Sequence, residues 1–212
     1  MAKFTTILAG AISILVMGIS AAPTIVTDSD SIMEKRCVPG TATILAPFDI
    51  IDFDITKPPS TPGWSSNPLF GVFQYSDNLI NYRQLLRFNP PSSGNCAWVM
   101  NLPQSRYNAE VLQDKPANNG GPVHLSFWGV EGSYKAGDSI SDVNIKPGSF
   151  GVSAVQPGEQ SFHQVPCDQI GTDLLVRIPE SDAPVTQSVY WRQDINPADR
   201  EGSLGIYMRV SW

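Results

Sequence analysis

The stretch Arg83–Pro103, RQLLRFNPPSSGNCAWVMNLP, indicates the fold class, because it holds two apolar runs separated by a turn segment. The insert Asn89–Asn95 contains two prolines, which cannot donate to a β-ladder, and Gly94, which tolerates a positive φ. After the insert, apolar residues recur at every second position: Cys96, Trp98, Met100 and Leu102. Residues two apart share one face of a strand. The stretch therefore predicts two β-strands joined by a loop, the second of them in the core.

The same two-residue period recurs along the rest of the chain. The C-terminal segment shows it most clearly, with Leu204, Ile206, Met208, Val210 and Trp212 on one face. The other expected strands are Thr41–Ile55 (one strand or two), Leu69–Ser76, Val123–Val130, Phe150–Val155, Thr172–Ile178 and Gln187–Gln193. Lys57–Pro68 and Arg106–Pro122 are expected to be mostly loop. About nine short strands predict an all-β fold, an antiparallel β-sandwich or jelly roll.

The N-terminal segment has the pattern of a signal peptide. Lys3 supplies a positive charge, and Ile7–Ile19 is an uncharged apolar run that is followed by small residues. The pattern predicts a signal peptide over residues 1–22, with cleavage after Ser20 favoured. An uncleaved membrane anchor is the alternative, and the Thr and Ser content of the run weakens it. We therefore expect a secreted protein that has no membrane contact after the signal is removed.

Residues 23–36 are polar and acidic and end in the dibasic pair Lys35-Arg36. This pair resembles a fungal furin-like processing site, so cleavage there would leave Cys37 at the new N-terminus. The alternative is a flexible lead-in with two solvated charges. Residues 37–212 are expected to form a single β-sandwich domain, which is long enough to bury a core of its own.

The composition and the missing motifs of the chain argue against a nucleic-acid partner, a metal site, a cofactor and one class of hydrolase. The formal net charge is −6, and no basic run occurs beyond Lys35-Arg36, which argues against nucleic acid as a partner. The three cysteines lie far apart without a CxxC motif, and the two histidines, His124 and His163, are not part of an HExxH motif. A Gly-rich phosphate loop and a GxSxG elbow are also absent from the sequence. The sequence therefore predicts no metal site, no cofactor and no Ser-His-Asp hydrolase, and His124 is expected on a polar strand face.

Carboxylates leave one catalytic possibility. Asp52 and Asp54 alternate with apolar residues, so they point to the same side of a strand, roughly 6.5–7 Å apart along it. Such a pair could act as acid and base on a glycosidic bond, or serve as calcium ligands. The favoured interpretation is the solvated face of an edge strand, which acidic residues protect from pairing.

Aromatic residues supply the candidate binding residues. Trp128, Tyr190 and Tyr207 lie opposite the most apolar face of their strands, with Arg192 and Arg209 near them in sequence. If those strands are neighbours, the five side chains could stack on a sugar ring or on a partner's side chain. The alternative, which we favour, is a second buried layer on the outer faces of the strands.

The order of several short pieces resembles a family of fungal secreted domains named for the C-terminal domain of a ubiquitin-3-binding protein. The pieces are Leu86–Phe88 before a Pro/Ser/Gly loop, Cys96–Pro103, Pro166–Cys167 before a Gly, and Tyr190–Gln193 before the last strand. The resemblance covers roughly residues 69–212 and implies a fold more than a mechanism. The family name implies an intracellular partner in ubiquitin-like conjugation. The predicted signal peptide contradicts that role, so the role is not carried over.

The resemblance also implies a disulfide between Cys96 and Cys167, since both cysteines lie in the resembling region. A bridge that includes Cys37 remains the alternative. On the chain-entropy model, the Cys96–Cys167 bridge would stabilise the fold by roughly 4 kcal/mol.

Two functions remain for this chain. The favoured one is a non-enzymatic, extracellular or cell-wall-associated β-sandwich that binds a cell-wall glycan or an extracellular protein. The alternative is a small secreted glycoside hydrolase that uses carboxylates.

Overall fold

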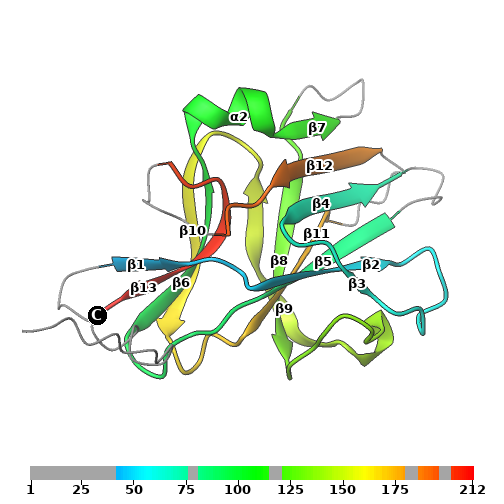
Figure 1. Ribbon diagram of the computed structural model, residues 1–212, viewed down its shortest axis with the longest axis horizontal. Coiled ribbons are helices and arrows are strands. Elements are labelled where there is room, and N and C mark those ends of the chain that lie inside the picture. The colour runs from blue at the N-terminus through cyan, green and yellow to red at the C-terminus, as the bar shows by residue number, and fades with distance from the viewer. Residues whose placement is uncertain (1–41, 76–80, 115–120, 180–185, 196–201) are drawn as a thin grey trace, which may run out of the picture. The chain divides into compact units, whose positions relative to one another are not determined.

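Thirteen strands form two antiparallel sheets in the part of the chain that the computed structural model describes, residues 42–75, 81–114, 121–179, 186–195 and 202–212 (Figure 1). The smaller sheet has the order β1-β13-β6-β10, formed by Ala42–Leu45, Gly205–Ser211, Asn95–Leu102 and Gly158–Pro166. The larger sheet has the order β7-β12-β4-β5-β11-β8-β9, with β2 paired to β5 and β3 paired to β2. The predicted antiparallel β-sandwich is confirmed.

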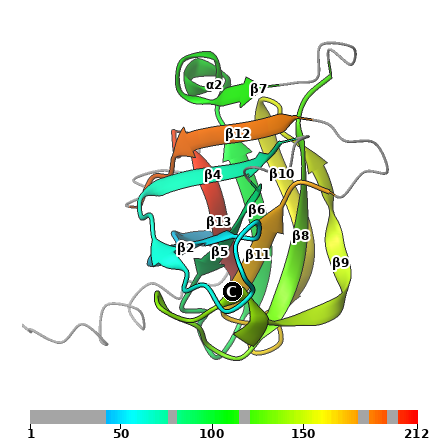
Figure 2. The ribbon, with the colours of Figure 1, turned by 90° about the vertical axis from the view of Figure 1, so that its right-hand side faces the viewer.

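The strands of the larger sheet have the following bounds: β2 Asp49–Asp54, β3 Trp64–Ser65, β4 Leu69–Gln74, β5 Asn81–Arg87, β7 Leu112–Asp114, β8 His124–Glu131, β9 Asn144–Ala154, β11 Asp173–Arg177 and β12 Gln187–Arg192. Two short helices accompany them, α2 (Gln104–Glu110) and the 3-10 helix η1 (Ile140–Asp142). Figure 2 shows β4 beside β12 and β8 beside β9. Among the described residues, no helix has the length and apolar character needed to cross a membrane.

The stretch Arg83–Pro103 spans both sheets. Its first strand, β5, lies in the larger sheet, and its second strand, β6, lies in the smaller one. The Pro-rich segment between them therefore crosses from one layer to the other. Phe88 just after β5 meets Trp98 of β6 with ring centroids 4.7 Å apart, and both side chains are fully buried. The segments before and after the Pro-rich insert thus pack on each other in the core through Phe88 and Trp98.

The main core lies between the two sheets and follows the predicted alternation. The smaller sheet contributes Cys96, Trp98, Met100, Leu102, Leu204, Ile206, Met208 and Val210. The larger sheet contributes, among others, Phe70, Val72, Leu86, Leu125, Phe127, Leu174, Val176, Val189 and Trp191. Trp212 packs against this core but is half-buried, because it lies just past the end of β13 at Ser211. Its predicted face is therefore confirmed, although its burial is incomplete.

A second apolar cluster covers the other face of the larger sheet. It joins Ile51, Phe53, Leu85 and Leu175 to Val130, Tyr134 and Val143. The central strands β2, β5 and β11 consequently carry apolar residues on both faces, which appear in the sequence as consecutive pairs such as Leu85-Leu86 and Leu174-Leu175.

Several elements differ from the expected ones. The count of about nine strands was low, because β3, β7 and β10 were not expected. β10 is an edge strand whose residues are largely polar or half-exposed, so it lacks the apolar alternation that marks a half-buried strand. The helix α2 lies in a segment that was expected to be loop, and its side chains are not fully buried.

The disulfide between Cys96 and Cys167 is confirmed, with an Sγ–Sγ distance of 2.13 Å. Cys96 lies opposite Val165 in the β6–β10 ladder, so the bridge joins neighbouring strands of the smaller sheet. Cys37, the dibasic pair Lys35-Arg36 and the predicted signal and pro-segments lie outside the described residues. The boundaries predicted at 1–22, 23–36 and 37–212 therefore stay predictions.

Candidate functional site

Aromatic and acidic side chains gather on one face of the larger sheet, where β3, β2, β5 and β4 lie side by side. In an antiparallel ladder, residues directly opposite each other share a face. Asp52 on β2 lies opposite both Trp64 on β3 and Gln84 on β5. One row of this face is therefore indole, carboxylate and amide.

The next row continues across the same face two residues further along the strands. Tyr82 on β5 lies opposite Asp54 on β2 and Phe73 on β4. We call the two rows, together with Tyr190, the aromatic face; its residues are Asp52, Asp54, Trp64, Phe73, Tyr82, Gln84 and Tyr190. The prediction that Asp52 and Asp54 share a face is confirmed.

The rings of the aromatic face meet edge to face. Tyr82 lies at 83° to Trp64 with centroids 5.6 Å apart, and at 86° to Phe73 with centroids 5.7 Å apart. Trp64 is 41% exposed, whereas Tyr82 and Phe73 are half-buried. The indole is therefore held by its neighbour yet open to solvent.

Tyr190 joins this face through a glycine. It lies opposite Gly71 in the β12–β4 ladder, on the side of the sheet that also carries Phe73. A Cβ added to Gly71 would come within 2.8 Å of Phe73 Cε2 and 3.2 Å of Tyr190 Cδ2. The missing side chain at Gly71 thus lets both rings lie against the strand.

Gln84 connects the aromatic face to the backbone of β4. Its amide NH₂ donates to Asp52 Oδ1, and at 3.3 Å to the Leu69 carbonyl, while its Oε1 accepts from the Gly71 N–H at 2.9 Å. β4 pairs with β5 only at Phe73 and Gln74. Where the two strands separate, the Gln84 amide therefore takes the place of a backbone partner.

Asp52 is a buried carboxylate without a cation. Only 8% of the residue is exposed, and burial raises its pKa to about 6, although hydrogen bonds from Gln84 and Ser66 act in the other direction. The groups that act on the pKa of Asp52, apart from burial, are the uncharged side chains of Gln84 and Ser66. The expected solvated face of an edge strand is therefore wrong for Asp52, because β2 lies between β3 and β5 and the Gln84 amide bonds to the carboxylate. Perturbed, cation-free carboxylates of this kind often mark functional sites.

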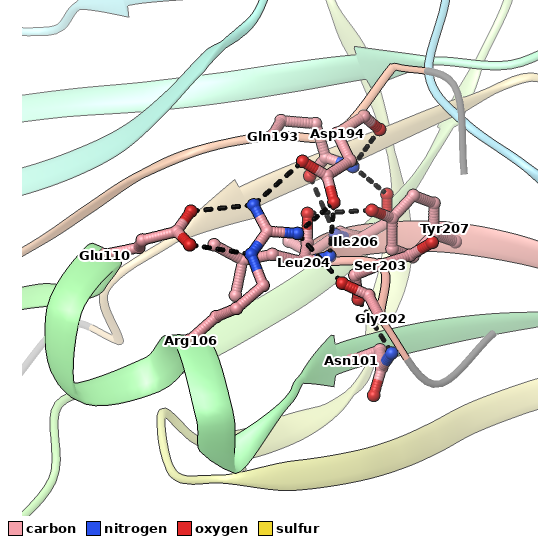
Figure 3. Close-up of polar contacts among 10 residues, drawn as sticks. All are labelled: Asn101, Arg106, Glu110, Gln193, Asp194, Gly202, Ser203, Leu204, Ile206 and Tyr207. Carbon is pink, nitrogen blue, oxygen red and sulfur yellow. Dashed lines mark hydrogen bonds and ion pairs between the residues drawn. The ribbon is translucent and has the colours of Figure 1, made fainter. Parts of the chain in front are cut away.

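A second polar cluster lies where α2 meets the end of β12 (Figure 3). Arg106 Nε and Nη2 donate to the Glu110 carboxylate at 2.7 Å each, and Nη2 also donates to Asp194 Oδ1 at 3.1 Å. Nη1 donates to Asp194 Oδ2 and, at 2.9 Å, to the Gly202 carbonyl. All five N–H groups of the guanidinium thus donate to acceptors within the protein. The Arg106 cluster, which comprises Arg106, Glu110, Asp194 and Gly202, therefore stabilises the fold and has no guanidinium donor left for a ligand.

The same region joins the two sheets. The side-chain amide of Gln193, just after β12, accepts from the Ile206 N–H at 2.8 Å and donates to its carbonyl at 3.1 Å. Tyr207 Oη donates to the Leu204 carbonyl at 2.7 Å. Tyr207 is only 1% exposed, and burial together with Asp194 raises its pKa. Tyr207, one of the five candidate binding residues, is therefore not a surface residue, and its burial agrees with the favoured alternative of a second buried layer.

The structure does not bring the five predicted binding residues together. Tyr190 and Arg192 share the aromatic side of β12, with Arg192 exposed and opposite Leu69. Trp128 lies on β8, which is not a neighbour of β12, and is half-buried with the Arg177 guanidinium 4.7 Å above its ring. Arg209 is in the smaller sheet and pairs with Glu159 at 2.8 Å. For Trp128 and Tyr207, burial rather than binding explains the pattern.

The two histidines lie away from the aromatic face. His124 is exposed on β8, as expected. His163 stacks on Phe150 with centroids 3.7 Å apart and has a positive φ of 53° at an irregularity of the β6–β10 ladder. Burial, with the nearby charge of Lys146, lowers the pKa of His163. In the described ranges, His, Cys, Asp and Glu residues form no group of three or more that could hold a metal ion.

Comparison of the chain with models of protein families, with curated proteins and with solved structures finds no match. The resemblance to the ubiquitin-3-binding-protein C-terminal domain family therefore stays a prediction, and the function has to be argued from the geometry.

Sequence reasoning missed four members of the aromatic face: Trp64, Phe73, Tyr82 and Gln84. Trp64 lies in a Pro-rich segment that was expected to be loop, and the residues around it show no alternation of apolar and polar side chains. Tyr82 and Gln84 did carry a signal, since they alternate ahead of the apolar pair Leu85-Leu86. Their position opposite Asp54 and Asp52 depends on strand register, which one chain's pattern does not specify.

Proposed function

We propose that this protein is a secreted, non-enzymatic β-sandwich domain that binds an extended glycan through the aromatic face, in the extracellular space or at a cell wall. The observation that carries the proposal is Trp64, a 41% exposed indole held edge to face against Tyr82 and opposite the carboxylate of Asp52. An aromatic ring stacks on the apolar side of a sugar, while neighbouring carboxylate and amide groups bond to its hydroxyls.

The arrangement of the rings favours an extended ligand. They come from β3, β5, β4 and β12, so they follow a line across the strands. With strands about 4.8 Å apart, this line is roughly 15–20 Å long. A stiff polysaccharide chain matches such a line better than a single small molecule does. Secretion rests on the predicted signal peptide, and the disulfide is compatible with it.

A glycoside hydrolase is the second candidate, and one observation favours it. The pKa of Asp52 is about 6, which suits a general acid, and Asp54 lies two residues away on the same face. However, Asp52 accepts hydrogen bonds from Gln84 and Ser66, and Asp54 Oδ1 accepts from Thr56 at 2.6 Å. Internal donors therefore hold one oxygen of each carboxyl group, Asp52 Oδ1 and Asp54 Oδ1, in a fixed position, which supports binding over proton transfer.

The test uses a panel of insoluble wall polysaccharides and measures both protein retention and released sugar. We expect retention on at least one polysaccharide without sugar release, and Trp64→Ala should weaken it by roughly tenfold or more. Phe48→Ala is the matched control, since Phe48 is 45% exposed but lies over the Arg87 guanidinium. Sugar release abolished by Asp52→Asn would establish the hydrolase instead. Retention on no polysaccharide would contradict glycan binding and favour an extracellular protein partner.

A further inference from the structure

We propose that the glycan carries free amino groups, that the half-buried Asp54 binds its cationic nitrogens between the rings of the aromatic face, and that the buried Asp52 adds its negative charge to this site. This inference rests on the proposed glycan binding and adds the chemical class of the ligand. The ligand class is a polymer of amino sugars whose nitrogens are not acetylated.

The charge of the aromatic face is the first reason. Its two rows carry two carboxylates, one amide and three rings, and no basic residue. The basic residue that the described strands place on this side, Arg192, lies at the far end of β12, opposite Leu69. Between Trp64 and Phe73 the described strands β2, β3, β4 and β5 therefore place only negative charge in these two rows, and the charge that complements it is positive.

The geometry of the rings is the second reason. Tyr82 stands nearly perpendicular to both Trp64 and Phe73, so neighbouring rings present faces and edges in different directions. A cation is attracted to the negative face of an aromatic ring, most strongly to that of Trp. Asp52 lies opposite Trp64, and Asp54 lies opposite Tyr82. Each carboxylate thus has an aromatic ring as its cross-strand neighbour, and half-buried Asp54 beside half-buried Tyr82 offers an ammonium group a carboxylate and a ring together.

The number of hydrogen-bond donors is the third reason. An ionised carboxylate only accepts, and a protonated amine supplies three donors and a full charge. The burial that raises the pKa of Asp52 disfavours its charged form, and a cation bound nearby would favour that form. Asp54 lies opposite Tyr82 in the ladder, and the pKa of Tyr82 is likewise raised, by burial first and then by the charges of Asp54 and Asp52. A neutral sugar would leave this negative field uncompensated.

The experiment measures the affinity of the mature chain, by calorimetry at pH 7, for three soluble oligomers of equal length: a glucosamine oligomer, an N-acetylglucosamine oligomer and a neutral glucose oligomer. We expect the glucosamine oligomer to bind at least tenfold more tightly than the other two. The double variant Asp52→Asn, Asp54→Asn should lose this preference but retain the weaker neutral binding. Both asparagines keep an oxygen that accepts from Gln84 or Thr56, so the fold should persist.

A matched control separates a specific site from attraction of a polycation to an acidic protein of net charge −6. Glu131→Gln with Asp168→Asn removes the same two charges at exposed positions outside the aromatic face and should leave the preference intact. Loss of preference in this control would overturn the inference. Equal binding of all three oligomers would also overturn it while leaving glycan binding in place. Binding of none would contradict both proposals.

Discussion

Asp52 and Asp194 each lie beside a glutamine, Gln84 and Gln193 respectively, whose side-chain amide bonds to the backbone of another strand. The surroundings of the two carboxylates differ. Asp194 faces the Arg106 guanidinium, and its pKa is lowered: burial alone would raise it, but hydrogen bonds from Arg106 and from the Leu204 N–H outweigh burial. Asp52 has neutral donors only, and burial raises its pKa to about 6. One carboxylate therefore stabilises the fold in its charged form, whereas the other destabilises it.

The difference distinguishes a structural site from a candidate binding site. In the Arg106 cluster every donor has an acceptor within the protein. On the aromatic face, burial disfavours the charged form of Asp52, and the hydrogen bonds from Gln84 and Ser66 do not outweigh it. Stability lost at a specific place is a common mark of function.

The largest effect is expected when the cation of the Arg106 cluster is removed. Arg106→Met should destabilise the protein at pH 7 by roughly 2–3 kcal/mol, since it leaves Asp194 and Glu110 without their partner in a partly exposed setting. Urea unfolding monitored by tryptophan fluorescence measures the change. A change below about 0.5 kcal/mol would show that the cluster does not fasten the fold, and the comparison with Asp52 would fail.

The second-largest effect is expected for Asp52→Asn, which should raise the free energy of unfolding instead of lowering it. The pKa of Asp52 rises from 3.8 to about 6 on folding, so its contribution is most favourable below pH 3.8 and is lost as the pH rises through 6. Asp52→Asn should therefore stabilise the protein at pH 8, by roughly 1–2 kcal/mol, and have little effect at pH 3.5. Unfolding curves at both pH values test this.

Asp194→Asn is the counterpart for this pH test. The folded-state pKa of Asp194 is lowered, so its contribution is present above the unfolded pKa and is lost as the pH falls. The variant should be destabilised at pH 8 and approach the wild type at low pH. Effects of equal sign at Asp52 and Asp194 would refute the distinction between them.

The smallest effect is expected at the outer carboxylate of the Arg106 cluster. The pKa of Glu110 is lowered by its hydrogen bonds with Arg106, but its side chain is 37% exposed, so solvent screens the pair. Glu110→Gln should cost less than about 1 kcal/mol at pH 7, and less again at high salt. A loss as large as that of Arg106→Met would mean that Glu110, rather than Asp194, is the main partner.

Much of the fold could be predicted because one face of most strands is buried. Alternation along β6 and β13 identified the core positions Trp98, Met100, Ile206 and Met208, all of which are fully buried. The edge strand β10 was missed, since an edge that is open to solvent does not impose a period. That β5 and β6 lie in different sheets could not be predicted, because residues from either sheet point into the same core.

The candidate site was predicted less completely. A period of two placed Asp52 and Asp54 on one face without further information. The burial of Asp52 depends on the pairing of β2 with both β3 and β5 and on the Gln84 amide beside it, and both are tertiary features. The five predicted binding residues failed as a group for the same reason, since strand order decides which outer faces are neighbours.

The position of the disulfide affects how the protein would respond to proteases. The bridge joins residues 71 positions apart, and that interval contains α2, β7, β8, β9 and β10. A single backbone cut anywhere in the interval leaves both pieces covalently attached, so the nicked molecule keeps its mass until it is reduced. The bridge also holds the C-terminal end of β10, an edge strand, against β6. In the presence of proteases, such a domain would therefore stay one covalent unit after a single cut.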